Sequence, residues 1–128
     1  MKHPKGSRKA ILVVEDEPSI SQVCLRTLNA DGFDVDIAIN GAIAQDMLAK
    51  KKYDLCLIDI RTPVMNGKEL YQHIKEEHPE SAQKVIFTTG DIMDSKLELL
   101  LKEAGNQYLP KPFTPDELRT IVRQALKG

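Results

Sequence analysis

Short apolar runs alternate with stretches of helical periodicity along most of this 128-residue chain. Five segments have the apolar pattern of β-strands, at residues 10–14, 33–39, 55–58, 85–87 and 107–109. Three of these segments are apolar at every position, which is typical of strands that are covered by helices on both faces. The segment at 33–39 alternates instead, with apolar residues at the odd positions, and this pattern predicts a strand with one buried face.

Helical periodicity fills the intervals between the predicted strands. Helices are predicted at residues 18–30, 40–52, 67–77, 95–104 and 114–127. Asn40 is the expected cap of the second helix, which should turn Ile43, Met47 and Leu48 toward the core. Five strand–helix units joined by right-handed crossovers predict a doubly wound α/β domain with a parallel sheet.

Composition narrows the class of protein. The apolar content of 41% and the charged content of 29% are ordinary for one globular domain, and no apolar run is long enough for a membrane span. A net charge of −1 speaks against direct binding of nucleic acid. Cys24 and Cys56 stand in apolar stretches without metal-site spacing, so we expect reduced core cysteines in a cytoplasmic protein.

The chain is expected to divide into an arm and one domain. Residues 1–9 contain four basic residues, no acid, and Pro, Gly and Ser, which predicts a flexible arm or linker stump. Residues 10–127 form the predicted domain.

The residues that follow the predicted strands carry the chemistry. Glu15 and Asp16 follow the first strand, Asp59 follows the third, Thr89 the fourth and Lys111 the fifth. The carboxyl ends of parallel strands meet at one edge of the sheet, where doubly wound proteins bind ligands. Three carboxylates crowded at one edge repel each other unless a cation binds, and oxygen ligands of this kind suit Mg²⁺.

Four motifs in order carry a family resemblance. They are ILVVEDEP at 11–18, DLCLIDIRTPVMNG at 54–67, VIFTTG at 85–90 and YLPKPF at 108–113. Over about residues 9–127, the chain resembles the receiver domain of two-component response regulators. That resemblance implies the flavodoxin-like (βα)5 fold, with five parallel strands in the order 2-1-3-4-5.

The resemblance also implies a role for each acidic residue. Asp59 would be the phosphoacceptor, which attacks the phosphohistidine of a partner and becomes an aspartyl phosphate. Asp16 would bind Mg²⁺ directly and Glu15 would hold it through water. Asp59 itself and the backbone carbonyl of Arg61 would complete the protein ligands.

Two further residues would hold the phosphoryl group. Lys111 would pair first with Asp59 and then with the phosphoryl group, and the Lys111–Pro112 peptide bond resembles one that is cis in the family. Thr89 would donate a hydrogen bond to a phosphoryl oxygen. Thr88 is the alternative hydroxyl, and the small Gly90 that follows supports Thr89.

The same resemblance implies a conformational switch. Tyr108 stands where the family carries an aromatic residue that turns inward when the threonine moves, so Thr89 and Tyr108 would form the switch. The output face would comprise the helix predicted at 95–104, the fifth strand and the last helix. Leu99 falls off the apolar stripe of its helix and would either serve a partner or transient homodimer there, or merely cover a neighbouring loop.

The expected partner is a sensor histidine kinase or a histidine phosphotransfer domain. No output domain is expected after Gly128, which leaves a stand-alone regulator or the receiver of a hybrid sensor kinase. Residues 67–91 and the linker-like arm favour the hybrid origin. An isolated receiver would not be a conventional enzyme, because its chemistry is limited to its own phosphorylation and dephosphorylation.

Two alternatives belong to other classes. Asp59 and the residues after it are similar to the DxDxT/V motif of haloacid-dehalogenase phosphatases, but Arg61 stands where that motif needs an acid. A pseudo-receiver that is never phosphorylated would act only as an interaction module. The intact set of acidic pair, Asp59, Thr89 and Lys111 speaks against it.

Overall fold

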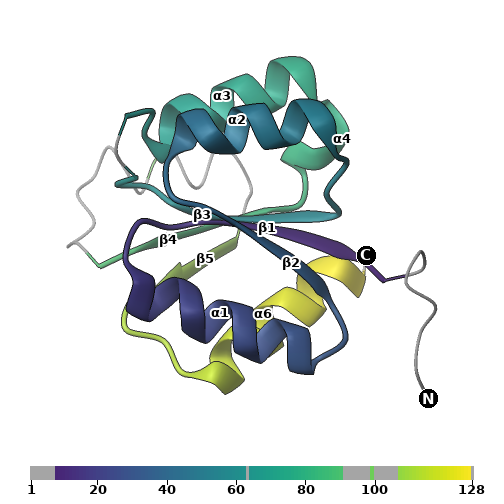
Figure 1. The fold of residues 1–128 in the computed structure, drawn as a ribbon, viewed down its shortest axis with the longest axis vertical. Coiled ribbons are helices and arrows are strands. Elements are labelled where there is room, and N and C mark those ends of the chain that lie inside the picture. Colours follow the sequence, from purple (N-terminus) through teal and green to yellow (C-terminus); the bar gives the residue numbers. More distant parts are fainter. Residues whose placement is uncertain (1–7, 63, 91–98, 100–106, 128) are drawn as a thin grey trace.

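A computed structural model of the chain describes residues 8–62, 64–90, 99 and 107–127. Its five strands form one parallel sheet in the order β2-β1-β3-β4-β5, which confirms the predicted topology (Figure 1). The strands are β1 (Ala10–Val14), β2 (Asp34–Ala38), β3 (Leu55–Asp59), β4 (Val85–Thr89) and β5 (Gln107–Pro110).

Helices cover both faces of this sheet. They are α1 (Pro18–Ala30), α2 (Gly41–Lys50), α3 (Gly67–Glu77), α4 (Pro79–Ala82) and α6 (Pro115–Lys127). Helices α2 and α3 lie on one side of the sheet, and α1 and α6 lie on the other (Figure 1). The short α4 was not predicted, although Pro79 at its first turn is a common start signal. Of the helix predicted at 95–104, only Leu99 is among the described residues, and it is helical.

The core consists of two apolar layers, one on each face of the sheet. Successive residues of a strand point to opposite faces, so each central strand contributes to both layers. On the α2 and α3 side, Tyr71 packs edge-to-face against Phe87 with ring centroids 5.2 Å apart. The opposite layer joins the sheet to the fully buried Leu28 of α1 and Leu118 of α6. This double cover explains why the central strands are apolar up to the polar residues at their carboxyl ends.

Helix α2 departs from the prediction. It ends at Lys50 rather than at 52, and Ile43 is 38% exposed instead of facing the core. Ala44 and Leu48, one turn apart, form the buried stripe of this helix, and Ile43 is rotated by roughly 100° from Ala44. Asn40 is the predicted cap and accepts a hydrogen bond from the backbone N–H of Ile43 at 2.8 Å.

Cys24 and Cys56 are buried and unpaired, as predicted. Burial raises the pKa of both thiols to about 12, so neither is a reactive thiolate at neutral pH.

Among the described helices, none has both the length and the apolar character that a membrane crossing requires. Residues 1–7 of the predicted arm lie outside the described residues.

Candidate functional site

The polar residues predicted from the strand ends meet at one edge of the sheet. Glu15 and Asp16 follow β1, Asp59 is the last residue of β3 and Thr89 is the last residue of β4. Strand pairing sets this arrangement, because β3 lies between β1 and β4 in the sheet. At its end, Asp59 stands directly beside Thr88 of β4.

Three carboxylates form the centre of the site. Glu15, Asp16 and Asp59 each offer an oxygen, and these oxygens lie within 4.8 Å of one another. Glu15 and Asp59 are buried, whereas Asp16 is exposed. Hard oxygen donors at this spacing, open to solvent on one side, fit a divalent cation such as Mg²⁺ that keeps water ligands.

Lys111 connects two of these carboxylates. Its Nζ lies 2.7 Å from Glu15 Oε1 and 3.0 Å from Asp59 Oδ2. Its backbone N–H donates to the carbonyl of Thr89 at 3.0 Å, and the Lys111–Pro112 peptide bond is cis, as the resemblance implied. The pair with Glu15 was not predicted. The one feature of the sequence that points to this ion pair is that Glu15 and Lys111 both follow strands of the same sheet.

The electrostatics of the site combine burial with ion pairing. Burial raises the pKa of Glu15 even though Lys111 donates a hydrogen bond to it. For Lys111, burial acts against the ammonium ion, but the bonds to Glu15 and Asp59 prevail and raise its pKa. The ammonium group is therefore charged at neutral pH and partly balances the crowded carboxylates.

The backbone after β3 fixes the carboxylate of Asp59. Asp59 Oδ1 accepts a hydrogen bond from the backbone N–H of Arg61 at 3.0 Å, while Oδ2 receives the Lys111 ammonium. Gly67 packs against this turn and donates its N–H to the carbonyl of Ile60 at 2.9 Å. A Cβ at Gly67 would lie 2.6 Å from Ile60 Cα and 3.0 Å from the Asp59 carbonyl oxygen. Glycine is therefore required at position 67, because the start of α3 lies too close to the turn after Asp59 for a side chain. The sequence analysis did not predict this role for Gly67.

The residues predicted to switch lie side by side. Tyr108 pairs with Phe87 across β4 and β5, and its hydroxyl donates to the backbone carbonyl of Thr89 at 3.4 Å. Thr88 and Thr89 are both buried, and Tyr108 is half-buried. Leu99 is 57% exposed, which matches its predicted place off the apolar stripe.

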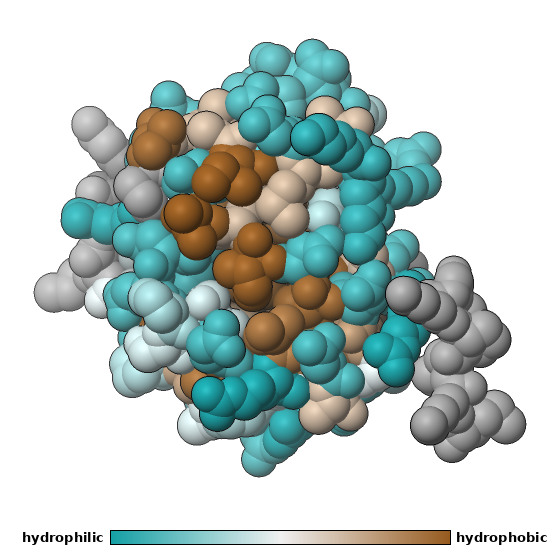
Figure 2. Space-filling model, viewed as in Figure 1, coloured by the Kyte–Doolittle hydropathy of each residue, from teal (hydrophilic) through white to brown (hydrophobic). Residues whose placement is uncertain are grey.

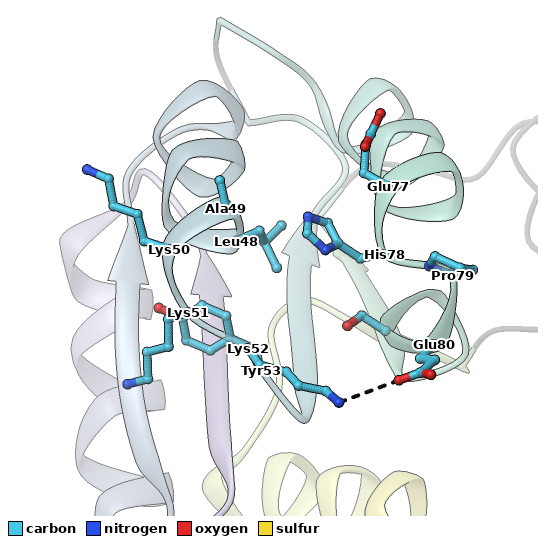
Figure 3. Close-up of a pocket in the computed structure, with 11 residues that line it drawn as sticks. Leu48, Ala49, Lys50, Lys51, Lys52, Tyr53, Glu77, His78, Pro79 and Glu80 are labelled. Atoms are coloured by element: carbon cyan, nitrogen blue, oxygen red, sulfur yellow. Dashed lines mark hydrogen bonds and ion pairs between the residues drawn. The ribbon is translucent and has the colours of Figure 1, made fainter.

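A separate hollow of about 470 Å³ lies at the other end of the sheet, where β3 and β4 begin. Its lining comes from the end of α2 and from the α3–α4 connection, with His78 pointing inward (Figure 3). An exposed ion pair between Lys52 and Glu80, 3.5 Å long, crosses its mouth (Figure 3). None of the predicted site residues lines this hollow.

Comparison with known sequences gives one consistent family. The response regulator receiver domain matches residues 11–123. The chain is 35% identical over 121 residues to the response regulator protein PilR of Pseudomonas aeruginosa, covering 94% of this chain and 27% of PilR. It is 34% identical over 117 residues to the transcription factor SKN7 of Saccharomyces cerevisiae, covering 91% of this chain and 18% of SKN7. The chain thus spans only a part of these relatives.

Solved structures agree with the sequence comparison. A CheY-like receiver domain protein from Methanospirillum hungatei superposes with a TM-score of 0.86 at 28% identity, covering 94% of this chain and 95% of that one. The receiver domain of the sensor histidine kinase PA1611 from Pseudomonas aeruginosa, which has a magnesium ion coordinated in its active site cleft, superposes with a TM-score of 0.82. It is 28% identical, with 95% of this chain and all of that chain covered. By sequence, fold and strand order, this chain belongs to the response regulator receiver domain family.

Proposed function

We propose that this domain is the phosphoacceptor of a two-component phosphorelay, with Asp59 as the acceptor. The observation that carries the proposal is the fixed position of the Asp59 carboxylate. One of its oxygens is held by the backbone N–H of Arg61 and the other by Lys111, beside the acidic pair Glu15 and Asp16. The phosphodonor would be a phosphohistidine of a sensor histidine kinase or of a histidine phosphotransfer domain.

The proposed step is a displacement at phosphorus. A carboxylate oxygen of Asp59 attacks the phosphorus atom, forming the new O–P bond of an acyl phosphate while the P–N bond to histidine breaks. The electron pair of that bond stays on the imidazole, which leaves neutral because its other ring nitrogen carries a proton. Positioning and charge neutralisation supply most of the catalysis in such transfers. Lys111, whose ammonium group contacts Asp59, would pair with the transferred phosphoryl group.

The acidic cluster would hold Mg²⁺. Asp16 would bind the ion directly, Glu15 would bind it through water, and Asp59 with the Arg61 carbonyl would complete the protein ligands. When bound, the ion neutralises charge between the carboxylates and the phosphoryl oxygens. Support comes from the close oxygens of the three carboxylates and from the magnesium ion in the PA1611 receiver.

Phosphorylation would be read out through Thr89 and Tyr108. A phosphoryl group adds about −1.5 to −2 charge beside Thr89, whose hydroxyl would move to donate a hydrogen bond to it. Because Tyr108 contacts the Thr89 carbonyl, that motion would change the environment of the tyrosine. The face that includes Leu99, β5 and α6 would then bind a partner or a second copy of the domain.

We infer a cytoplasmic location from the unpaired cysteines and the family's kinase partners.

The experiment is phosphorylation by acetyl phosphate with Mg²⁺, read by intact-protein mass spectrometry. The wild type should gain roughly 80 Da, the mass of one phosphoryl group, and Asp59→Asn should gain nothing. Asp46→Asn is the matched control, because it removes an exposed carboxylate on α2, and it should be labelled like the wild type. A wild type that is never labelled would instead indicate a pseudo-receiver, and labelled Asp59→Asn would exclude Asp59 as the acceptor.

A further inference from the structure

Two histidine rings lie together at the end of α3, away from the acidic edge of the sheet. The ring centroids of His73 and His78 are 5.9 Å apart, and the ring planes meet at 67°. Both residues are half-buried, so one side of the pair is open to solvent. Imidazole nitrogen is a preferred ligand of Zn²⁺ and of similar transition-metal ions. The pair is therefore a candidate metal site of a different chemistry from the carboxylate cluster.

The proline after His78 brings the two rings together. On a regular helix, residues five apart point about 140° away from each other. The residue before a proline is disfavoured in the helical conformation, and α3 accordingly ends at Glu77, with His78 at φ −138° and ψ 61°. This turn of the backbone places the ring of His78 beside that of His73, at the hollow where β3 and β4 begin (Figure 3).

The spacing of the two rings suits a single metal ion between them. With Zn–N bonds of about 2.0–2.1 Å, two imidazoles on a tetrahedral Zn²⁺ have their centroids roughly 5 Å apart. A small rotation of the two side chains would close the observed 5.9 Å to that value. Figure 2, viewed as Figure 1, shows mostly hydrophilic side chains over the ends of α2 and α3 near α4. Water can therefore supply ligands that the protein does not.

Gln45 of α2 holds one of the two rings. Its Nε2 lies 3.3 Å from His73 Nδ1. The two ends of a side-chain amide exchange by a half-turn, and Gln45 Oε1 would then accept a hydrogen bond from the Nδ1–H of His73. That tautomer leaves the lone pair of His73 Nε2 free for a metal ion. Histidines that ligate a metal almost always donate their other ring N–H to an oxygen in this way.

A carboxylate is available as a third ligand. Glu77 follows His73 by one helical turn on α3, and residues four apart lie on the same face of a helix. Its exposed side chain points away from His78 in Figure 3 and would have to rotate toward the pair. Glu80 is less suited, because it already pairs with Lys52 at 3.5 Å. Two nitrogens and one oxygen suit Zn²⁺, whereas Mg²⁺ prefers oxygen ligands alone.

We propose that His73 and His78 bind Zn²⁺ or a similar divalent transition-metal ion. Gln45 would orient the ring of His73, and Glu77 would supply a third ligand. The ion would tie the end of α3 to the turn that enters α4. This site lies at the opposite end of the sheet from the acidic cluster, so Mg²⁺ at the acidic cluster should leave it free.

Isothermal titration with Zn²⁺ tests the site, with Mg²⁺ in large excess to occupy the acidic cluster. The wild type should bind Zn²⁺, and His73→Gln and His78→Gln should each lose that binding. His3→Gln is the matched control, because it removes the remaining histidine of the chain, and it should bind like the wild type. NMR of the wild-type imidazole groups identifies the ligands without a mutation, and the signals of His73 and His78 should shift together.

Two variants of Gln45 separate an orienting role from simple packing. Gln45→Leu should weaken Zn²⁺ binding by roughly tenfold or more, which is typical for the loss of a hydrogen-bond partner of a ligating histidine. Gln45→Glu keeps an oxygen that accepts from Nδ1–H and should bind at least as tightly as the wild type. Equal binding by these two variants would contradict the role of Gln45.

Three results would overturn the proposed site as a whole. The first is a wild type whose imidazole signals do not respond to Zn²⁺ at millimolar concentration. The second is unchanged Zn²⁺ binding in both His73→Gln and His78→Gln. The third is binding that only His3→Gln removes.

Discussion

Two clusters in this molecule have the same composition, one lysine between two carboxylates. Lys111 lies 2.7 and 3.0 Å from Glu15 and Asp59, and Lys51 lies 3.1 and 3.0 Å from Asp34 and Asp36. The distances hardly differ, but the burial does. The side chains of the Lys111 cluster are at most 10% exposed, and those of the Lys51 cluster are at least 33% exposed.

Burial decides what each cluster can do. Water screens the exposed charges around Lys51, so the pairs contribute little to stability and mainly neutralise the edge of β2. Around Lys111, water is largely excluded and a third carboxylate, Asp16, lies beside the pair. Removing the central ammonium group there would leave buried carboxylates without their partner, which is costly.

The largest expected effect comes from removing each lysine. In Mg²⁺-free buffer, Lys111→Met should lower the free energy of unfolding by about 3 kcal/mol, because it leaves buried carboxylates unpaired. Lys51→Met should cost less than about 1 kcal/mol, as for an exposed pair. Urea unfolding at neutral pH measures both, and equal losses would contradict the distinction between the clusters.

Mg²⁺ should act on one cluster only. If it binds the folded state at the acidic site, it stabilises the wild type by about 2.7 kcal/mol at 100-fold excess over its Kd. Asp16→Ala should abolish this gain, and it should raise stability without metal because it relieves carboxylate repulsion. Asp36→Ala, in the exposed cluster, should keep the full gain. Thermal melts with and without Mg²⁺ measure the shifts, and an unchanged shift in Asp16→Ala would exclude that residue as a ligand.

The backbone behind the buried cluster gives a third test. Gly67→Ala should destabilise the protein by about 2 kcal/mol, because the new Cβ would clash with the turn that carries Asp59. Gly90→Ala is the control at the same edge. Among the residues that the structure describes, its Cβ would meet nothing closer than Lys111 Cβ at 3.7 Å, so it should be tolerated. Chemical denaturation of the pair checks this, and a harmless Gly67→Ala would show that the turn can shift freely.

The sequence predicted the parallel sheet, its strand order and which residues stand at the strand ends. These features follow from local apolar patterns and from family motifs, both of which are visible in one chain. The exposure of Ile43 and the contact of Lys111 with Glu15 were missed. Both depend on how elements far apart in sequence are rotated against each other, and periodicity within a single element does not contain that information.

The smallest expected effect is a difference in pH dependence. Hydrogen bonds from Tyr53 and Lys51 outweigh burial and hold the pKa of Asp36 below its ordinary value of 3.8. Its stabilising contribution is therefore present above that pH and is lost as the pH falls through the lowered pKa. Asp36→Asn should thus be slightly less stable than the wild type at neutral pH and should converge with it in acid.

The pH dependence of stability should have the opposite sign for Glu15. Burial raises the pKa of Glu15 above its ordinary value of 4.5. Without Mg²⁺, the folded protein therefore loses stability as the pH rises from 4.5 through the raised pKa, because the folded state holds this proton more tightly than the unfolded chain. The free energy of unfolding of Glu15→Gln should therefore increase relative to that of the wild type as the pH rises above 4.5. Urea midpoints between about pH 3 and pH 7 test both variants. Parallel curves for the two variants would contradict the assigned directions.

The most direct test of the central claim locates the phosphoryl group itself. The domain is phosphorylated with acetyl phosphate and Mg²⁺, treated with borohydride to reduce the acyl phosphate to an alcohol, and digested for peptide mass spectrometry. The account predicts that residue 59 is converted to homoserine and that Glu15, Asp16 and Asp36 are unchanged. Conversion at another carboxylate, with residue 59 still aspartate, would contradict it.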